Sequence, residues 1–372
     1  MNKEEPALQR DSLVLPGQVV LVLQGGGALG AFQGGVYEAM HEQGIEPDWI
    51  IGTSIGAING ALIAGNPVER RLVRLKEFWR RLSTSAPTVP VPDKSVGQFF
   101  SSLSVLAGGV TGFFSPRPLG WQGIYSDNGV DRASYYCTDA LTQTLSELLD
   151  TDALASRQPR LTVGAVNVRS GAMRYFDSRD EKLTVDHIRA SGALPPYFGA
   201  VRIDSEPYWD GGIYSNTPIE AVLDDRPRRD SLIFAVQVWQ PAAAEPPSIW
   251  EVLGRQKDIQ YASRDMSHLS RQRQIHRLRH IIRELSTRLP QEQLERPEVQ
   301  ELIAYGCGTT MHVVHLQAPR VAGENHTKDI DFTPRGIRTR WDAGYADTLN
   351  ALQRRAWLEK SDPIEGIVEH KL

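Results

Sequence analysis

Ser54 stands between two glycines, Gly52 and Gly56, at the junction of the apolar pair Ile50-Ile51 and a helical pattern that starts at Ile55. This G-x-S-x-G spacing is typical of a nucleophile elbow, which presents a serine hydroxyl at the end of a sheet. Such a turn strains the serine backbone and leaves no room for a Cβ at either glycine. The following helix N-terminus favours an oxyanion through its free N–H groups and partial positive charge. The simpler alternative is a tight strand-to-helix turn without a catalytic role.

A glycine-rich segment follows the first apolar run of the chain. Its consecutive glycines, Gly25, Gly26 and Gly27, expose backbone N–H groups around a concavity that suits an anion. Together with Gly30 they also fit the dinucleotide-binding fingerprint, but that site needs an acidic residue closing the second strand, whereas Asp48 opens it. A P-loop is not indicated either, because no lysine and hydroxyl follow the glycines. We therefore favour an oxyanion hole.

A serine nucleophile needs a group that accepts its proton. Of the nine histidines, only His187 lies in the central part of the expected core, and nothing near it resembles a triad loop. Asp210 precedes Gly211 and Gly212, which would allow its loop to approach the serine closely. An isolated Asp-Gly-Gly is most often a simple turn. Beside an elbow and a glycine-rich loop, Asp210 becomes a candidate base.

The elements that would position these residues alternate between strands and helices. Continuous apolar runs predict buried strands, and helical spacing predicts the segments between them. The predicted strands are 19–23, 48–51, 161–167, 232–238 and 311–316, with a hairpin strand at 173–177. This alternation with short turns predicts a three-layer α/β/α architecture with a mainly parallel central sheet, plus a helical insertion in the C-terminal third.

The chain divides into segments of different character. We predict a loose leader, a catalytic core, a linker with a basic helical insertion, a strand and helix that return to the core, and a tail. Their ranges are 1–17, 18–238, 239–308, 309–360 and 361–372. Within the core, the proline-punctuated excursion 84–130 is either extra core packing or a lid that lines an acyl site. The candidate lining residues are Phe99, Phe100, Phe113, Phe114 and Trp121.

Composition narrows the class of protein further. The net charge of −4 over 372 residues gives no global field that would attract nucleic acid. Two distant cysteines, Cys137 and Cys307, predict reduced thiols. Because the N-terminus lacks the features of a signal peptide and no run approaches the roughly 18 apolar residues of a membrane span, we expect a cytoplasmic protein with at most peripheral membrane contact.

The segment 255–288 carries nine basic and three acidic residues. A solvated helix face is the usual reason for such a run. The functional alternative is contact with anionic lipid headgroups, worth about 1 kcal/mol per basic residue near the surface. Apolar residues repeat here at intervals of three and four, which predicts one packed face. They are Ile275, Leu278, Ile281, Ile282, Leu285 and Leu289.

Three motifs, taken in order, resemble those of the patatin-like phospholipase family: the glycines at 25–30, G-T-S-I-G at 52–56 and D-G-G at 210–212. Segments 190–198 and 208–218 resemble family stretches too. The resemblance implies Ser54 as nucleophile, Asp210 as base, no catalytic histidine, and no metal or organic cofactor. It also implies an oxyanion hole from the N–H groups of Gly25, Gly26 and Gly27. The supporting glycines would be Gly30, Gly52, Gly56, Gly211 and Gly212.

The expected activity is a lipid acyl hydrolase that cleaves carboxylic esters through an acyl-serine intermediate, as a phospholipase A, lysophospholipase or esterase. Two places depart from the family, which often has Asp and a basic residue where this chain has Gln24 and Leu29. Both changes remove charge beside the expected oxyanion site. The sequence therefore leaves open whether the substrate is a phospholipid or another ester. The alternatives are a thioesterase, a depolymerase of hydroxyalkanoate polyester, and an idle lipid-binding or regulatory protein. The expected partner is a lipid or acyl ester, with no nucleic acid.

Overall fold

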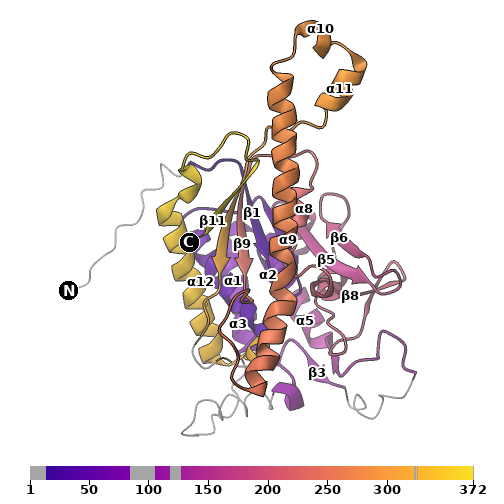
Figure 1. Cartoon of the computed structure of the whole chain (residues 1–372). Coiled ribbons are helices and arrows are strands. Elements are labelled where there is room, and N and C mark those ends of the chain that lie inside the picture. Colours follow the sequence, from indigo (N-terminus) through magenta and orange to yellow (C-terminus); the bar gives the residue numbers. More distant parts are fainter. Residues whose placement is uncertain (1–13, 84–104, 118–126, 322–323, 325, 372) are drawn as a thin grey trace, which may run out of the picture.

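The computed structural model describes residues 14–83, 105–117, 127–321, 324 and 326–371, and in helix α9 it leaves out the side chains of 263–267. A twisted sheet forms the centre of the molecule, with helices on both of its faces (Figure 1). None of the helices in these segments combines the length and the apolar character required to cross a bilayer.

Nine strands of the described chain form the main sheet, in the order β11-β10-β9-β1-β2-β5-β8-β7, with β6 also paired to β5. The pairings from β11 to β5 are all parallel, and those that involve β6, β7 and β8 are antiparallel. The parallel strands are β1 (Gln18–Leu23), β2 (Trp49–Thr53), β5 (Arg160–Asn167), β9 (Ser231–Gln237), β10 (Met311–Gln317) and β11 (Ile367–Lys371). The others are β6 (Met173–Asp177), β7 (Val201–Ile203) and β8 (Glu206–Asp210); β3 (Ser115–Pro116) and β4 (Tyr136–Cys137) pair separately.

The helices follow the apolar periodicity of the sequence. They are α1 (Ala31–Glu42), α2 (Ile55–Ala64), α3 (Val68–Leu82), α5 (Asp139–Leu148), α6 (Thr151–Ala155), α7 (Val185–Ser191), α8 (Glu220–Leu223), α9 (Ile249–Ser286), α10 (Gln291–Leu294), α11 (Pro297–Ile303) and α12 (Pro334–Arg354). The described residues also form four short 3₁₀ turns: η1 (Gly27–Gly30), η3 (Gly211–Ile213), η4 (Lys328–Ile330) and η5 (Ala356–Leu358).

Strand β1 shows why the fold has three layers. Its side chains alternate between the two faces of the sheet, as the period of a strand requires. Val19, Leu21 and Leu23 pack into the core that also holds residues of α1, α2, α3 and α12. Val20 and Val22 pack into the core on the opposite face, with residues of α8 and α9. Because both faces are covered, the strand is apolar throughout, and the predicted three-layer architecture is confirmed.

Two predictions about the C-terminal part are wrong. The predicted tail 361–372 contains β11, which pairs in parallel with β10 and extends the sheet. The apolar stripe of the basic segment does not pack along its whole length, because the C-terminal end of α9 projects beyond the sheet (Figure 1). There Leu278 and Leu285 are 60% and 57% exposed. The short β11 has polar residues among its apolar ones, so it lacked the continuous apolar run that identified the other parallel strands.

Candidate active site

Ser54 lies in the turn between β2 and α2. Its φ of 56° and ψ of −122° place a non-glycine residue in a rarely populated and strained region. The elbow glycines allow this turn because a Cβ at Gly52 would lie 2.3 Å from the carbonyl oxygen of Gly56. A Cβ at Gly56 would lie 2.2 Å from the carbonyl oxygen of Leu23. The serine is therefore held at the carboxyl end of β2 by a turn that has no space for larger residues.

Asp210 ends strand β8, and β5 brings it close to Ser54. Thr53, the residue before the serine, pairs with Gly164 of β5, and Asp210 pairs with the next residue, Ala165. The Asp210 side chain is buried. It accepts the N–H of Gly212 at 2.7 Å, and the Ser54 hydroxyl lies near enough to stabilise its charged form. The structure thus places the serine hydroxyl beside a buried carboxyl.

The protonation of Asp210 follows from its surroundings. Burial disfavours the charged carboxylate and raises the pKa of Asp210 to about 7. The Ser54 hydroxyl and the Gly212 N–H act in the opposite direction and stabilise the carboxylate. A carboxyl with this pKa accepts and returns a proton near neutral pH, which suits a general base.

Two residues that sequence reasoning did not single out hold this turn and the glycine loop. Ser191, at the end of α7, accepts the backbone N–H of Ser54 on its Oγ at 3.0 Å. Asn216 donates its Nδ2 to the carbonyl oxygen of Gly25 at 3.1 Å. Both lie in the segments 190–198 and 208–218 that resemble the family, which was the available signal. Their roles depend on contacts between distant parts of the chain.

The glycine loop lies against the serine, since a Cβ at Gly25 would be 3.1 Å from the Cβ of Ser54. The N–H of Gly25 is already engaged, because it donates to the carbonyl oxygen of Asn216 at 3.1 Å. For Gly26 and Gly27, no acceptor of the N–H group exists among the residues that the structure describes. Gly27 has a φ of +56°, which a residue with a side chain rarely adopts.

Gln24 replaces the acidic residue that the family often carries, and it is completely buried. Its Oε1 accepts the N–H groups of Val238 and Trp239 at 2.6 and 3.0 Å. Its Nε2 donates to Thr217 Oγ1 at 2.7 Å and to the carbonyl oxygen of Tyr261 at 3.3 Å. An amide supplies both donors and acceptors here, whereas a carboxylate could only accept. Gln24 therefore ties the start of the glycine loop to β9 and α9.

The remaining predicted residues lie in other surroundings. His187 forms part of the cap of α7, with its Nδ1 accepting the N–H of Thr184 at 3.1 Å and its Nε2 3.5 Å from a Glu181 oxygen. Phe113 and Phe114 are buried in the core, with ring centroids 6.3 and 5.4 Å from that of Phe198. Phe99, Phe100 and Trp121 lie outside the described residues. Within the described segments, no group of three His, Cys, Asp or Glu residues is arranged to hold a metal ion.

Part of the chain is similar in sequence to known fungal proteins. The chain is 42% identical over 260 residues to "Lysophospholipase NTE1" of Kluyveromyces lactis, which covers 65% of this chain and 14% of that protein. It is 40% identical over 240 residues to the Saccharomyces cerevisiae protein of the same name, covering 60% of this chain and 11% of the relative. The chain thus spans a small part of these relatives.

Among solved structures, VipD from Legionella pneumophila aligns with a TM-score of 0.41 at 16% identity, covering 91% of this chain and 67% of that one. The family model described as "Patatin-like phospholipase" matches residues 21–223, more than half of the chain, and a second, described as "Patatin phospholipase", matches residues 259–364. With the three motifs in order and the sheet that carries them, this match shows that the chain belongs to the patatin-like phospholipase family.

Proposed function

We propose that this protein hydrolyses carboxylic esters of lipids, with Ser54 as nucleophile and Asp210 as general base. The single observation that carries the proposal is the position of the Ser54 hydroxyl beside Asp210, a buried carboxyl whose pKa is about 7. A serine hydroxyl is a weak nucleophile until a neighbouring group takes its proton. Backbone strain at Ser54 and burial of the Asp210 carboxyl both destabilise the folded state, and both are features found at functional sites.

The reaction would proceed in two steps. Asp210 takes the hydroxyl proton as Ser54 Oγ attacks the carbonyl carbon, and it then gives that proton to the departing alcohol as the ester C–O bond breaks. Water next attacks the acyl-serine, transferring one proton to Asp210, which returns it to Ser54 Oγ as the acid leaves. The N–H groups of Gly26 and Gly27 would stabilise the oxyanion in both steps, since that of Gly25 is engaged by Asn216.

The names of the relatives favour a lipid with an acyl chain as substrate. Both of the fungal relatives described above are named lysophospholipase, and a Schizosaccharomyces pombe protein that is 39% identical over 94 residues is named triacylglycerol lipase. We infer that the substrate is an ester of a long-chain acid, of the lysophospholipid kind. A role of Phe113 and Phe114 in lining the acyl chain stays a prediction, because their burial among other aromatic rings equally suits core packing.

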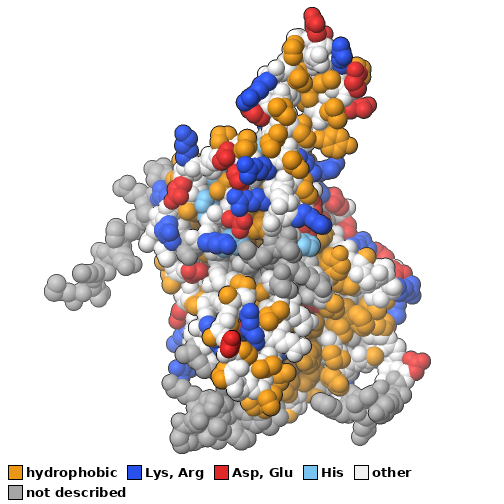
Figure 2. Space-filling model, viewed as in Figure 1, with side chains coloured by type: hydrophobic (Ala, Val, Ile, Leu, Met, Phe, Trp, Pro, Cys, Tyr) orange, Lys and Arg blue, Asp and Glu red, His pale blue; other side chains and the backbone are white. Residues whose placement is uncertain are grey.

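Contact with a lipid surface also stays a prediction for residues 255–288. Several of the basic side chains in this range are already paired with carboxylates, namely Lys257, Arg273, Arg277 and Arg288. Figure 2 shows acidic, basic and hydrophobic side chains mixed over the projecting tip. The first two turns of α9 instead expose apolar side chains, which suit a lipid surface better. These are Ile249, Trp250, Val252 and Leu253.

Hydrolysis of p-nitrophenyl acyl esters and of lysophosphatidylcholine by the full chain tests the proposal. Ser54→Ala and Asp210→Asn should each lower kcat by at least about a thousandfold, in the range seen when members of catalytic pairs are removed. Asp347→Asn is the matched control, since this carboxyl on α12 also has a pKa raised by burial. Undiminished turnover in either active-site variant would remove the proposed pair.

Two further measurements separate the alternatives. A fluorophosphonate probe should label wild type at Ser54 and leave Ser54→Ala unlabelled; no adduct on wild type would favour an idle binding protein. A comparison of kcat/KM for acyl esters, acyl thioesters and hydroxyalkanoate oligomers separates a lipid hydrolase from a thioesterase or a polyester depolymerase.

A further inference from the structure

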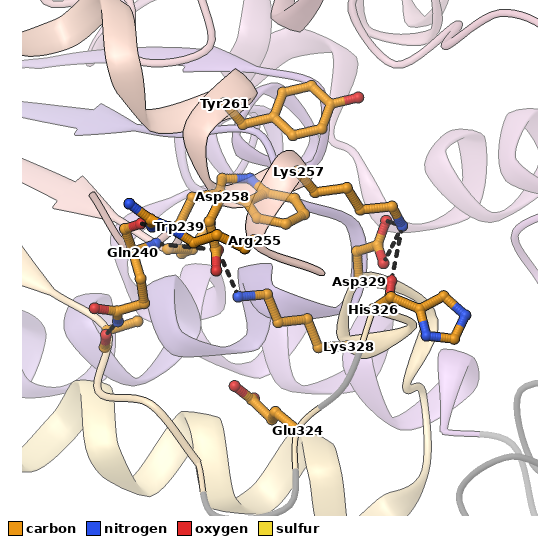
Figure 3. Close-up of polar contacts among 12 residues, drawn as sticks. Trp239, Gln240, Arg255, Lys257, Asp258, Tyr261, Glu324, His326, Lys328 and Asp329 are labelled. Atoms are coloured by element: carbon orange, nitrogen blue, oxygen red, sulfur yellow. Dashed lines mark hydrogen bonds and ion pairs between the residues drawn. The ribbon is translucent and has the colours of Figure 1, made fainter. Parts of the chain in front are cut away.

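Two ion pairs of opposite polarity join helix α9 to the short turn η4 beside the glycine loop. Asp258 of α9 accepts a hydrogen bond from Lys328 Nζ at 2.6 Å, and Lys257 Nζ lies 2.8 Å from the carboxylate of Asp329. Figure 3 shows Lys328 pointing toward Asp258 and Lys257 pointing toward Asp329. Because adjacent residues carry opposite charges on both segments, a slip by one residue would oppose like charges. The pairing therefore fixes one register between α9 and η4.

The inner pair, Asp258 with Lys328, is the more informative one. Both residues are more than nine-tenths buried. The desolvation of two charges can outweigh their attraction, so a buried ion pair is weak evidence for stability. The pair instead orients the groups around it. Asp258 also accepts the N–H of Gln240 at 3.3 Å. The carboxylate thus connects α9 both to η4 and to the chain that leaves β9.

Trp239, the residue before Gln240, connects this charge cluster to the glycine loop. Lys328 Nζ lies 5.2 Å from the centroid of its ring, and the ring of Tyr261 lies 4.9 Å from it. The indole N–H donates to the carbonyl oxygen of Gly25 at 2.7 Å. Trp239 is buried, so its ring has little freedom to move. A continuous series of contacts therefore runs from α9 through η4 to the backbone of the loop.

The same elements also touch the next two glycines. A Cβ on Gly26 would lie 3.2 Å from Trp239 Nε1, and a Cβ on Gly27 would lie 2.3 Å from the carbonyl oxygen of Asp329. A run of glycines has the greatest backbone freedom of any sequence, yet oxyanion donors act only when they are fixed in advance. This loop therefore needs anchors from outside itself, and Trp239 and η4 supply them.

We propose that Trp239 and Lys328 are positioning residues that hold the Gly25–Gly27 backbone in its oxyanion-binding form. Lys328, fixed by Asp258, would keep the indole in place, and the indole N–H would fix the orientation of the Gly25 peptide. The inference rests on the proposed function, because it assigns a purpose to the loop only if that loop stabilises an oxyanion. It makes the C-terminal region, matched separately over residues 259–364, a part of the active site.

Trp239→Phe tests the proposal because it keeps an aromatic ring and removes the indole N–H. For p-nitrophenyl butyrate we expect kcat to fall at least about tenfold with KM within about twofold, since displaced oxyanion donors act on the transition state. Hydrogen exchange of residues 25–30 should become faster. Trp357→Phe is the matched control, because Trp357 is buried and its indole N–H also donates to a carbonyl oxygen, that of Val14 at 3.3 Å.

The control should lose thermal stability and keep its kcat. Should Trp239→Phe not fold, Lys328→Met retains the indole and is expected to lower kcat and accelerate loop exchange in the same direction. Unchanged kcat and unchanged exchange in Trp239→Phe, or an equal loss of kcat in Trp357→Phe, would overturn the inference. Failure of the proposed function would look different: wild type would neither turn over the ester nor take the fluorophosphonate at Ser54, while hydrogen exchange would still decide whether Trp239 fixes the loop.

Discussion

The backbone N–H of Ser54 donates to the side-chain oxygen of Ser191, 3.0 Å away, across the boundary between α2 and α7. Ser191 is completely buried, so no water competes for this bond. The strained turn at Ser54 is therefore held by a side chain from another part of the fold. Ser191 contacts the backbone of Ser54 and not its hydroxyl. A change at Ser191 therefore tests the position of the nucleophile and leaves its reacting group in place.

Ser191→Ala should leave the Ser54 N–H buried without a partner. We expect a loss of about 1–3 kcal/mol in the free energy of unfolding, together with a lower kcat because the elbow relaxes. Urea unfolding and ester hydrolysis measure the two effects. Ser178→Ala is the control, since Ser178 Oγ accepts the N–H of Leu161 at 2.9 Å away from the site. It should lose comparable stability and keep its kcat; equal kcat in both variants would contradict the positioning role of Ser191.

The activity should depend on pH through Asp210. Only the carboxylate form accepts the serine proton, and burial raises the pKa of Asp210 to about 7. We therefore expect kcat/KM to rise with pH and to reach half of its maximum near pH 7. A profile from pH 5 to 9 with a neutral p-nitrophenyl ester measures this. A flat profile over that range would mean that another group limits the reaction.

Asp210→Asn should stabilise the fold at alkaline pH while it removes activity. The folded pKa of about 7 lies above the ordinary value of about 3.9, so wild type loses stability as pH rises from about 4 to 7. Asparagine does not ionise. We expect a melting temperature higher than that of wild type by roughly 2 °C or more at pH 8.5, with the difference shrinking toward pH 4. A pH-independent difference would exclude ionisation of Asp210 as the cause.

Removal of one partner from the buried ion pair between α9 and η4 should lower the free energy of unfolding. Lys328→Met leaves the Asp258 carboxylate buried without its cation, which we expect to cost about 3–5 kcal/mol. Adding Asp258→Asn to Lys328→Met should restore a large part of that loss. Denaturant unfolding of the wild type, the two single variants and the double variant gives the coupling energy. Additive losses would show that the two side chains do not act as a pair.

We expect a lipid surface to bind the exposed apolar residues at the start of α9 and not the paired basic residues farther along the helix. We expect the full chain to sediment with vesicles of phosphatidylcholine and phosphatidylserine, and the double variant Ile249→Ser with Val252→Ser to bind less. Both side chains are at least half exposed, so the fold should tolerate the change. Loss of binding in 0.5 M salt with no effect of the double variant would instead favour the basic residues. No sedimentation of wild type would reject the membrane contact.

The sequence was most informative where chemistry depends on neighbours along the chain. Ser54 and its two glycines form a local turn, and the Asp-Gly-Gly at 210–212 places its carboxyl at a strand end, so motif spacing could identify both. Their approach then depends on β5, whose residues Gly164 and Ala165 pair with the two neighbouring strands. Apolar runs predicted the sheet because strands buried on both faces have few polar residues.

Other features depend on packing between segments that are distant in sequence. Nothing in the local sequence of Trp239 or Lys328 indicates that they converge on the Gly25 peptide. From the sequence, Gln24 is only a position where a charged residue is replaced by a neutral one. In the structure its amide has hydrogen-bond partners on both of its polar atoms. The spacing of Leu278 and Leu285 predicted a packed face, but helical periodicity does not reveal whether a partner element exists.

The order of strands has a consequence for synthesis of the chain. Strand β1 lies between β2 and β9, yet β9 begins only at Ser231. At a ribosomal rate of about 5–20 residues per second, the apolar edge of β1 waits roughly 10–40 s for this partner. During that interval the nascent chain presents an unpaired, hydrophobic strand, a natural target for a holding chaperone.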